Sequence, residues 1–169
     1  VRTLVTGNLG YIGSVLTPRL TDLDYEVVGL DCGFFRGCIV GAVPDDVPTI
    51  LRDMRDVRPE DVVGFDAVIH LAGLSNDPLG ELVPSLTEEI NFHATMRLAT
   101  FAKDAGVKRF IYSSSQSMYG ISTTDAELDE DNSTKSPVTA YAKTKWEAET
   151  ALEDMATPDF LTVSFRPST

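Results

Sequence analysis

The stretch that decides the fold is Thr6-Gly7-Asn8-Leu9-Gly10-Tyr11-Ile12-Gly13. It follows a short apolar segment, 2–6, that predicts a strand, and it opens a segment, 11–23, that predicts a helix. Glycines three residues apart leave the backbone unshielded by Cβ atoms, so an anion can approach the amide groups at the helix N-terminus. We expect Gly7 to make the turn, Gly10 to admit a pyrophosphate and Gly13 to let helix and strand pack closely. Glycines also mark ordinary turns, so this interpretation depends on the rest of the chain.

Composition and charge limit the classes of partner. The chain has 169 residues, enough for one domain with a buried core, and 43% of them are apolar. Its net charge of -12 argues against binding to nucleic acid or to an anionic membrane, since both need a basic surface. We find no apolar run near the ~20 residues of a membrane-spanning helix and no secretory leader, and therefore expect a cytoplasmic protein. The spacing of Cys32 and Cys38 matches no metal or redox motif and indicates reduced thiols.

Strands alternate with helices along the chain. Apolar runs predict further strands at 26–30, 49–52, 66–73, 108–113 and 160–165, and other segments predict helices at 58–63, 85–105 and 136–155. This alternation predicts an α/β fold, a doubly wound parallel sheet in three αβα layers, with loops at 33–48, 74–84 and 114–131.

The first helix carries two further expectations. Its apolar residues should form one core-facing stripe, made of Ile12, Val15, Leu16, Leu20 and Leu23. Pro18 should bend it, because proline lacks the amide that would bond Ser14.

Asp31 follows the second predicted strand, 24 residues after Gly7. A doubly wound fold places there the carboxylate that receives the ribose hydroxyls of a dinucleotide. A carboxylate at this point favours NAD over NADP, because it repels a 2′-phosphate. Arg36 argues the other way, unless it is a solvated loop cation.

Tyr141 and Lys145 are four residues apart on a predicted helix, so their side chains share one face. An ammonium near a phenol stabilises the phenolate, which suits a tyrosine acting as general base near neutral pH. An amphipathic helix with a chance Tyr and Lys is the alternative. Ser113-Ser114-Ser115 supports the catalytic interpretation, because it ends a predicted strand at the sheet edge where this fold places its site.

Taken together, the chain resembles the extended short-chain dehydrogenase/reductase family, a Rossmann fold, and within it the nucleotide-sugar epimerase and dehydratase branch. The motifs occur in family order over the whole length: Thr6-Gly7-x-x-Gly10-x-x-Gly13, Asp31, Asp53-Met54-Arg55-Asp56, His70-Leu71-Ala72-Gly73, Ser113-Ser114-Ser115-x-x-x-Tyr119-Gly120, Tyr141-x-x-x-Lys145 and Arg166-Pro167. The resemblance implies that residues 1–169 form the NAD-binding domain. The chain stops directly after a predicted strand, and we expect the family's C-terminal substrate domain to be missing.

The resemblance also implies roles for individual residues. Tyr141 would be the general base, Lys145 would hold the nicotinamide ribose, Ser115 would bond the reacting hydroxyl, and Asn91 would order the site unless it is a solvent-facing helix residue. The cofactor-binding set would be Gly7, Asn8, Leu9, Gly10, Tyr11, Ile12, Gly13, Asp31, Cys32, Asp53, Met54, Leu71, Ala72, Gly73, Ser113, Ser114, Tyr141, Lys145 and Pro167.

The implied reaction is transient oxidation of a sugar carbinol, commonly at C4, with NAD as cofactor. Family dehydratases place an Asp-Glu pair after the catalytic hydroxyl residue, whereas this chain has Gln116-Ser117, so we rank epimerase above dehydratase. A reductase of the same family and a non-catalytic NAD-sensing protein remain as alternatives. Asn76 is a candidate substrate contact, with a plain turn as the other interpretation.

The remaining expectations concern metals, histidines and assembly. His70 and His93 read as structural, and no cluster of side chains has metal-ligand spacing. Because family members commonly pair through two long helices, we expect a homodimer that uses the helices at 85–105 and 136–155.

Overall fold

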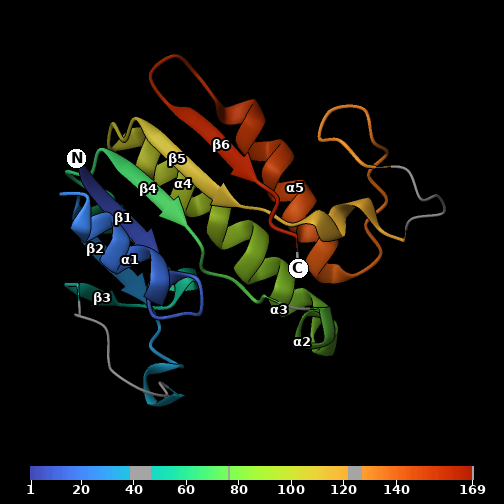
Figure 1. Cartoon of the computed structure of the whole chain (residues 1–169), viewed down its shortest axis with the longest axis horizontal. Coiled ribbons are helices and arrows are strands. Elements are labelled where there is room, and N and C mark those ends of the chain that lie inside the picture. Colours follow the sequence, from blue (N-terminus) through green and yellow to red (C-terminus); the bar gives the residue numbers. More distant parts are fainter. Residues whose placement is uncertain (39–46, 76, 122–126, 169) are drawn as a thin grey trace.

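The structure, a computed structural model, describes residues 1–38, 47–75, 77–121 and 127–168. They form a six-stranded sheet in the order β3-β2-β1-β4-β5-β6, in which all neighbouring strands are parallel (Figure 1). The strands are β1 (Arg2–Thr6), β2 (Glu26–Asp31), β3 (Thr49–Leu51), β4 (Ala67–His70), β5 (Arg109–Ser113) and β6 (Leu161–Phe165). The predicted doubly wound sheet is confirmed, and its direction of growth reverses between β1 and β4.

Helices connect the strands on both faces of the sheet. They are α1 (Gly13–Asp22), α2 (Asp77–Leu82), α3 (Pro84–Glu88), α4 (Ala94–Asp104) and α5 (Ala140–Met155), with a π-helical turn η4 (Glu89–His93) between α3 and α4. Short 3-10 turns are η1 (Arg36–Cys38), η2 (Met54–Asp56), η3 (Pro59–Val62) and η5 (Gln116–Tyr119). The single helix predicted over 85–105 thus contains a π turn, and α2 lies in a segment predicted as a loop.

Right-handed crossovers put α1 on one face of the sheet and α4 and α5 on the other. The hydrophobic core lies between the sheet and this second pair of helices. Leu4, Val68 and Phe110 of the strands meet Leu98 of α4 and Leu152 of α5 there, and all five are fully buried. The core therefore fixes α5, the helix that carries Tyr141 and Lys145, against the sheet.

The first helix packs differently from its apolar pattern. Ile12, Val15 and Leu23 are 48%, 55% and 68% exposed, so the predicted core-facing stripe is wrong for these residues. The buried residues of α1 are Gly13 and Thr17, because the close approach of Gly13 to the glycine loop turns this narrow side inward. The helix continues through Pro18 to Asp22, and the predicted bend stays a prediction.

Strand β6 forms one edge of the sheet, beside α5 (Figure 1). Thr162 and Ser164 are half-buried on the α5 side, where they line a cavity with residues of that helix. Leu161, Val163 and Phe165 alternate with them and are exposed on the opposite face. The sheet face over β6 is thus apolar and open.

One glycine of the sheet is required by a side chain of the glycine loop. A Cβ at Gly29 of β2 would lie 2.2 Å from the Asn8 amide carbon. That amide is buried, and its Nδ2 donates to Thr49 Oγ1 at 2.9 Å, so Asn8 ties the loop to β3 across β2. The side chain of Asn8 therefore points into the protein, and only its backbone is left to contact a ligand.

The Gly29→Ala variant is expected to lower the free energy of unfolding by about 1–3 kcal/mol, because the added methyl group overpacks the site. Urea unfolding of the single variants and of Asn8→Ala/Gly29→Ala measures the coupling. Removing the amide makes room for the methyl group, so the double variant should lose less than the sum of the single losses. Additive losses would show that a clash with the Asn8 amide does not cause the lower stability of Gly29→Ala.

Candidate active site

The loop between β1 and α1 has the geometry of an anion site. Gly7 has a φ of 72°, and a Cβ on it would lie 2.8 Å from the Ala72 nitrogen. A Cβ on Gly13 would lie 2.2 Å from the Gly7 carbonyl oxygen, so both positions require glycine. No side chain caps α1 at Ile12. The helix N-terminus therefore stays available to an anion.

The carboxylate of Asp31 is fixed beside this loop. Oδ2 accepts from the Leu9 amide at 3.2 Å, and Oδ1 accepts from the Gly33 amide at 2.7 Å. The structure thus brings Asp31 and the glycine loop together, as their spacing predicts. Cys32 and Tyr11, also in the predicted cofactor set, are exposed.

The family resemblance would place Asp53 and Met54 beside the adenine of the cofactor, and the two residues differ in what they expose. The Asp53 carboxylate binds the Arg55 guanidinium at 2.7 Å, and this hydrogen bond lowers the pKa of the Asp53 carboxyl. Met54 is buried in the hydrophobic core. Its side chain cannot contact an adenine, which leaves the backbone of Met54 for that role.

A buried asparagine, Asn91, holds the segment after β4 by two hydrogen bonds. Asn91 Oδ1 accepts from the Leu74 amide at 2.8 Å, and its Nδ2 donates to the Leu74 carbonyl at 3.0 Å. A Cβ on Gly73 would lie 2.9 Å from the same oxygen. Asn91 is 1% exposed, within the π turn, so its solvent-facing alternative is wrong. A π turn is frequent at functional sites, and here it directs Asn91 toward the segment that holds Leu71, Ala72 and Gly73.

The three catalytic candidates other than Asn91 meet at the carboxyl end of β5. Lys145 is 5% exposed, and its Nζ donates to the Ser113 carbonyl at 2.8 Å and lies 5.9 Å from the Tyr141 ring centroid. Ser115 is buried and caps η5 by accepting from the Ser117 amide at 3.1 Å, and its hydroxyl lies near enough to the Tyr141 phenol to influence the pKa of that phenol. Burial lowers the pKa of Lys145 to about 8. Ser114, which lies between Ser113 and Ser115 in the chain, has a buried hydroxyl without a partner among the described residues.

The pKa of Tyr141 differs from the expectation that a lysine depresses it. Burial raises the pKa of the phenol, hydrogen bonding with Ser115 lowers it, and the charge of Asp77 raises it. In this state Lys145 is engaged by the Ser113 carbonyl rather than by the phenol oxygen. The net direction is upward, so the arrangement alone does not generate a phenolate at neutral pH.

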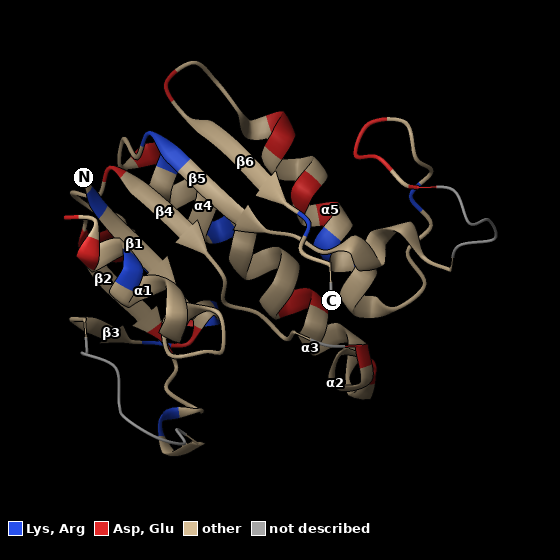
Figure 2. Cartoon of the chain, viewed as in Figure 1, with Lys and Arg blue, Asp and Glu red and all other residues tan. Residues whose placement is uncertain are grey.

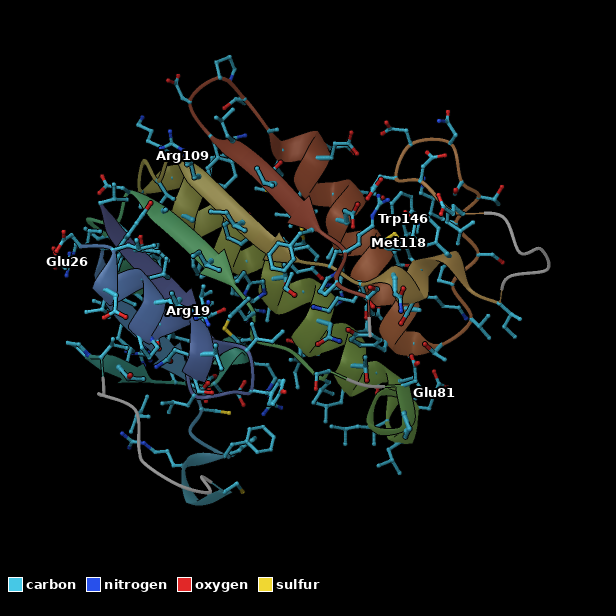
Figure 3. All side chains as sticks on the ribbon, viewed as in Figure 1. Arg19, Glu26, Glu81, Arg109, Met118 and Trp146 are labelled. Carbon is cyan, nitrogen blue, oxygen red and sulfur yellow. The ribbon has the colours of Figure 1, made fainter. Side chains whose placement is uncertain are left out.

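Helix α2 caps the N-terminus of α5. Thr139 Oγ1 accepts from the Ala142 amide at 3.1 Å and donates to Asp77, while the Ala140 amide donates to Glu81. Figure 3 labels Glu81 on α2. At Gly80 a Cβ would lie 3.3 Å from the Tyr141 Cβ. The two carboxylates therefore stabilise the start of the helix directly before Tyr141. Asn76, the candidate substrate contact, lies outside the described residues.

Thr139→Ala is expected to lower the free energy of unfolding by about 1 kcal/mol, since it removes the cap of α5. Thr139→Ser keeps the hydroxyl and is the matched control, which should stay near the unaltered protein. Chemical denaturation of both variants measures the difference. Equal losses in the two variants would assign the effect to the methyl group instead.

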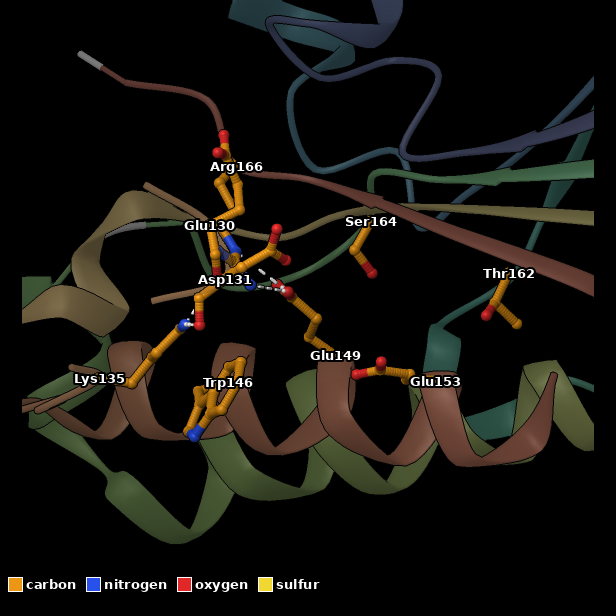
Figure 4. A pocket seen from close by; sticks show the side chains of 9 residues that line it. All are labelled: Glu130, Asp131, Lys135, Trp146, Glu149, Glu153, Thr162, Ser164 and Arg166. Atoms are coloured by element: carbon orange, nitrogen blue, oxygen red, sulfur yellow. Dashed lines mark hydrogen bonds and ion pairs between the residues drawn. The ribbon is translucent and has the colours of Figure 1, made fainter. Parts of the chain in front are cut away.

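Arg166 forms a second buried cluster, on the β6 side of α5. Its Nε donates to Glu149 Oε1 at 3.0 Å, and its carbon Cζ lies 5.5 Å from the Tyr119 ring and 5.8 Å from the Trp146 ring. A cavity of about 410 Å³ opens here, lined by Glu130, Asp131, Lys135, Trp146, Glu149, Glu153, Thr162, Ser164 and Arg166 (Figure 4). It includes none of the predicted catalytic residues. The cluster fixes the backbone that leads to Pro167, which is exposed.

Sequence reasoning missed Glu149, Asp77 and Glu81. Glu149 lies four residues after Lys145, so the spacing that relates Tyr141 to Lys145 continues to it and was the available signal. Asp77 and Glu81 are also four residues apart. They fall in a segment predicted as a loop, where this spacing carries no meaning.

The two histidines have different surroundings. His70 is fully buried, and burial, with the charge of Lys145, lowers its pKa to about 3. His93 is exposed on η4. Among the described residues, neither histidine forms a hydrogen bond with the Tyr141 phenol. This agrees with the interpretation that both histidines are structural.

Buried His70 should make the fold acid-sensitive. Its pKa is about 6.5 in unfolded chains and about 3 here, so the unfolded state binds more protons between these values. The stabilisation is therefore complete above pH 6.5 and is lost as the pH falls toward 3. Between pH 7 and 4.5 we expect this residue to remove on the order of 2 kcal/mol from the free energy of unfolding.

Urea unfolding at pH 7 and 4.5 measures this loss, and Asn substitutions at the two histidines separate its source. His70→Asn should flatten the pH dependence, whereas the exposed control His93→Asn should keep it. A dependence that is unchanged by His70→Asn would contradict the expectation.

The charges and the possible metal ligands of the described residues exclude few further functions. Figure 2 shows acidic residues along α5 and in the loop that follows η5, in keeping with the net charge of -12. Within residues 1–38, 47–75, 77–121 and 127–168, no group of three His, Cys, Asp or Glu side chains is placed to hold a metal ion. In the same ranges no helix is long and apolar enough to cross a membrane.

Curated proteins that are similar to this chain include UDP-glucose 4-epimerases. UDP-glucose 4-epimerase from Mus musculus is 30% identical over 179 residues, covering 94% of this chain and 50% of the relative, and the enzyme from Streptomyces lividans is 33% identical over 128 residues, covering 69% of this chain and 36% of the relative. The chain spans about half the length, or less, of these curated relatives.

Solved structures and a family model agree with these relatives. MoeE5 in complex with UDP-glucuronic acid and NAD has a TM-score of 0.83 and 30% identity, over 98% of this chain and 54% of that one. UDP-N-acetylglucosamine 4-epimerase from Methanobrevibacter ruminantium has a TM-score of 0.84 and 26% identity, over 98% and 54%. The model of the NAD dependent epimerase/dehydratase family matches residues 3–169. The chain therefore belongs to the NAD dependent epimerase/dehydratase family.

Proposed function

We propose that this chain is the cofactor-binding and catalytic part of an NAD-dependent nucleotide-sugar epimerase. The observation that carries the proposal is the meeting of Ser115, Tyr141 and Lys145 at the carboxyl end of β5, beside the Gly73 segment. A domain that binds the nucleotide-sugar would follow in the whole protein, because the relatives are about twice as long.

The residues present fit NAD. Gly7 and Gly13 form a cradle that any Cβ would fill, and it adjoins an uncapped helix N-terminus suited to a pyrophosphate. Asp31 offers a carboxylate for ribose hydroxyls next to the loop. Arg36, the feature that argued for NADP, is exposed and forms no hydrogen bond or ion pair with Asp31 among the described residues, which supports NAD.

In the proposed mechanism Tyr141 as phenolate accepts the proton of a sugar hydroxyl, which Ser115 holds by a hydrogen bond. When bound, NAD supplies the acceptor for the hydride that leaves the carbinol carbon. Lys145 provides positive charge, and its buried position beneath the site lets it move from the Ser113 carbonyl to a cofactor ribose and the phenol. That move would lower the pKa of Tyr141, which burial otherwise raises. Asn91 keeps the segment beneath the cofactor in place.

Epimerisation is favoured over dehydration by the residues after Ser115. Gln116 is exposed and Ser117 bonds the Ser115 hydroxyl, and neither side chain can serve as the acid–base pair that elimination of water needs. Incubation of the full-length protein with UDP-glucose and UDP-N-acetylglucosamine should give the C4 epimers. A 4-keto-6-deoxy product would assign a dehydratase, and net consumption of NADH with a ketone substrate would assign a reductase.

A non-catalytic sensor of NAD is the candidate from a different class. It is disfavoured because Ser115, Tyr141 and Lys145 are all present and lie together. A full-length protein that binds NAD but turns over none of these substrates would support the sensor.

Assembly and location belong to the same proposal. We propose a homodimer that pairs α4 and α5 of each subunit, and a cytoplasmic location. Light scattering of the full-length protein tests the first, and localisation of a tagged protein in the cell tests the second. A monomer at micromolar concentration would exclude the dimer.

A further inference from the structure

A hydrogen-bonded chain runs beneath the candidate site from β1 to the π turn. The Ala72 amide donates to Thr6 Oγ1 at 3.3 Å, and this oxygen lies 2.6 Å from His70 Nδ1. On the other side of the ring, His70 Nε2 lies 2.8 Å from Thr95 Oγ1, which donates to the Asn91 carbonyl at 2.8 Å. The side chains of Thr6, His70 and Thr95 are at most 1% exposed, so water does not compete for these bonds.

The two ends of this chain fix the position of each hydrogen in it. A backbone amide only donates, so Thr6 Oγ1 accepts from Ala72, and its own hydrogen, which has no other acceptor among the described residues, is directed to His70 Nδ1. A backbone carbonyl only accepts, so the Thr95 hydroxyl donates to Asn91 and accepts from His70 Nε2. Both requirements are met by one form of the ring, the neutral imidazole with its hydrogen on Nε2.

The surroundings of the ring favour the same form. An imidazolium would donate from both nitrogens and leave the Thr6 hydroxyl hydrogen without its acceptor. It would also be repelled by Lys145, the charged group whose field reaches the ring, and it would gain no water. The other neighbours are the rings of Phe110 and Tyr112, whose centroids lie 5.9 and 5.8 Å away.

We propose that His70 is a positioning residue, which joins the floor of the cofactor site at Thr6 and Ala72 to Asn91 through a single fixed set of hydrogen bonds. Thr6 directly precedes Gly7, and Asn91 holds Leu74. The ring thus links the segment that would carry the pyrophosphate to the segment beneath the reacting groups. This inference rests on the proposed function only for the identity of the reaction that His70 assists.

Two substitutions at His70 each keep one half of the chain. In His70→Asn the amide oxygen can replace Nδ1 as the acceptor for Thr6, but the link to Thr95 is lost. In His70→Gln the amide nitrogen can replace Nε2 as the donor to Thr95, but the link to Thr6 is lost. We expect His70→Asn to lower kcat about tenfold with NAD affinity within threefold, and His70→Gln to weaken NAD binding about tenfold with a smaller loss in kcat.

A double-mutant cycle tests whether the bonds act as a unit. Thr6→Val and Thr95→Val remove one hydroxyl each without changing side-chain shape, and each hydroxyl bonds the His70 ring rather than the other threonine. We expect each to lower kcat/KM about tenfold, and the double variant to lower it about 30-fold rather than 100-fold. Thr3→Val is the matched control on the same strand, because the Thr3 hydroxyl is buried without a partner among the described residues, and it should leave kcat/KM unchanged.

A nitrogen-detected NMR spectrum of the full-length protein, assigned with the His70→Asn variant, reads the ring directly. A signal of a neutral ring with hydrogen on Nε2 supports the proposal, and hydrogen on Nδ1 or on both nitrogens overturns it. Additive losses of Thr6→Val and Thr95→Val in the double variant would also overturn it. So would His70→Asn and His70→Gln that change NAD affinity and kcat in the same proportion. If the protein turns over no nucleotide-sugar, the proposed function fails, yet the NMR signal and the NAD affinities still decide the role of His70.

Discussion

Tyr141→Phe is expected to lower kcat by about 10²–10⁴-fold, because it removes the proposed general base and leaves the ring in place. Tyr141 lies on the core-packed helix α5, with Ser115 and Lys145 beside it, so the ring of phenylalanine should keep its position. NAD affinity should change little, since the glycine loop and Asp31 are untouched. Steady-state turnover of a nucleotide-sugar by the full-length protein, with NAD binding by titration, measures both quantities.

Tyr112→Phe is the matched control for this substitution. Tyr112 lies on β5 with its ring 4.8 Å from Lys145 Nζ, but its hydroxyl is buried without a partner among the described residues. Burial raises the pKa of this phenol, so it stays protonated and has no part in proton transfer. The control should keep kcat within a few-fold. Unchanged turnover in Tyr141→Phe itself would refute a tyrosine base.

Glu149→Gln is expected to lower the free energy of unfolding by about 3–5 kcal/mol, because it leaves the Arg166 guanidinium buried without its counter-charge. The two side chains are 10% and 12% exposed, and Glu149 Oε1 accepts from both Nε and Nη2 of Arg166. The pair raises the pKa of Arg166, so the arginine cannot lose its charge instead. Urea unfolding at pH 7 measures the loss.

Glu153→Gln provides the control for this substitution. Glu153 lines the same cavity one turn further along α5, but it is exposed and has no ion pair among the described residues. Its loss should change stability by at most about 0.5 kcal/mol. Glu149→Leu/Arg166→Met should recover much of the stability, because an apolar pair of similar volume avoids the uncompensated charge. Equal losses in the Gln variants at 149 and 153 would contradict a structural ion pair.

Local patterns predicted the sheet and the residues that end its strands. Parallel strands align their carboxyl ends, so Gly7, Asp31 and Ser115 could be assigned to one edge from the order of the elements alone. The inward direction of Asn8 could not be predicted, because it depends on contact with Gly29, which is distant in sequence.

Helix packing was less predictable than strand order. The π turn at η4 depends on tertiary contacts of Asn91 with the Leu74 backbone, which a periodicity of 3.6 residues does not report. Helix α2 is short, and its capping bonds to α5 join residues about 60 positions apart. The exposed side of α1 followed from the close approach of Gly13, which outweighed the apolar pattern at Val15.

The outer edge of β6 has a consequence for work with residues 1–169 alone. Its outward backbone groups are unpaired among the described residues, and Leu161, Val163 and Phe165 present an apolar row beside them. Such an edge is a template for strand addition by another molecule, and it promotes aggregation. A dimer observed with this stretch by itself therefore does not separate edge-to-edge pairing at β6 from pairing of α4 and α5, and it should not be counted as evidence for the latter.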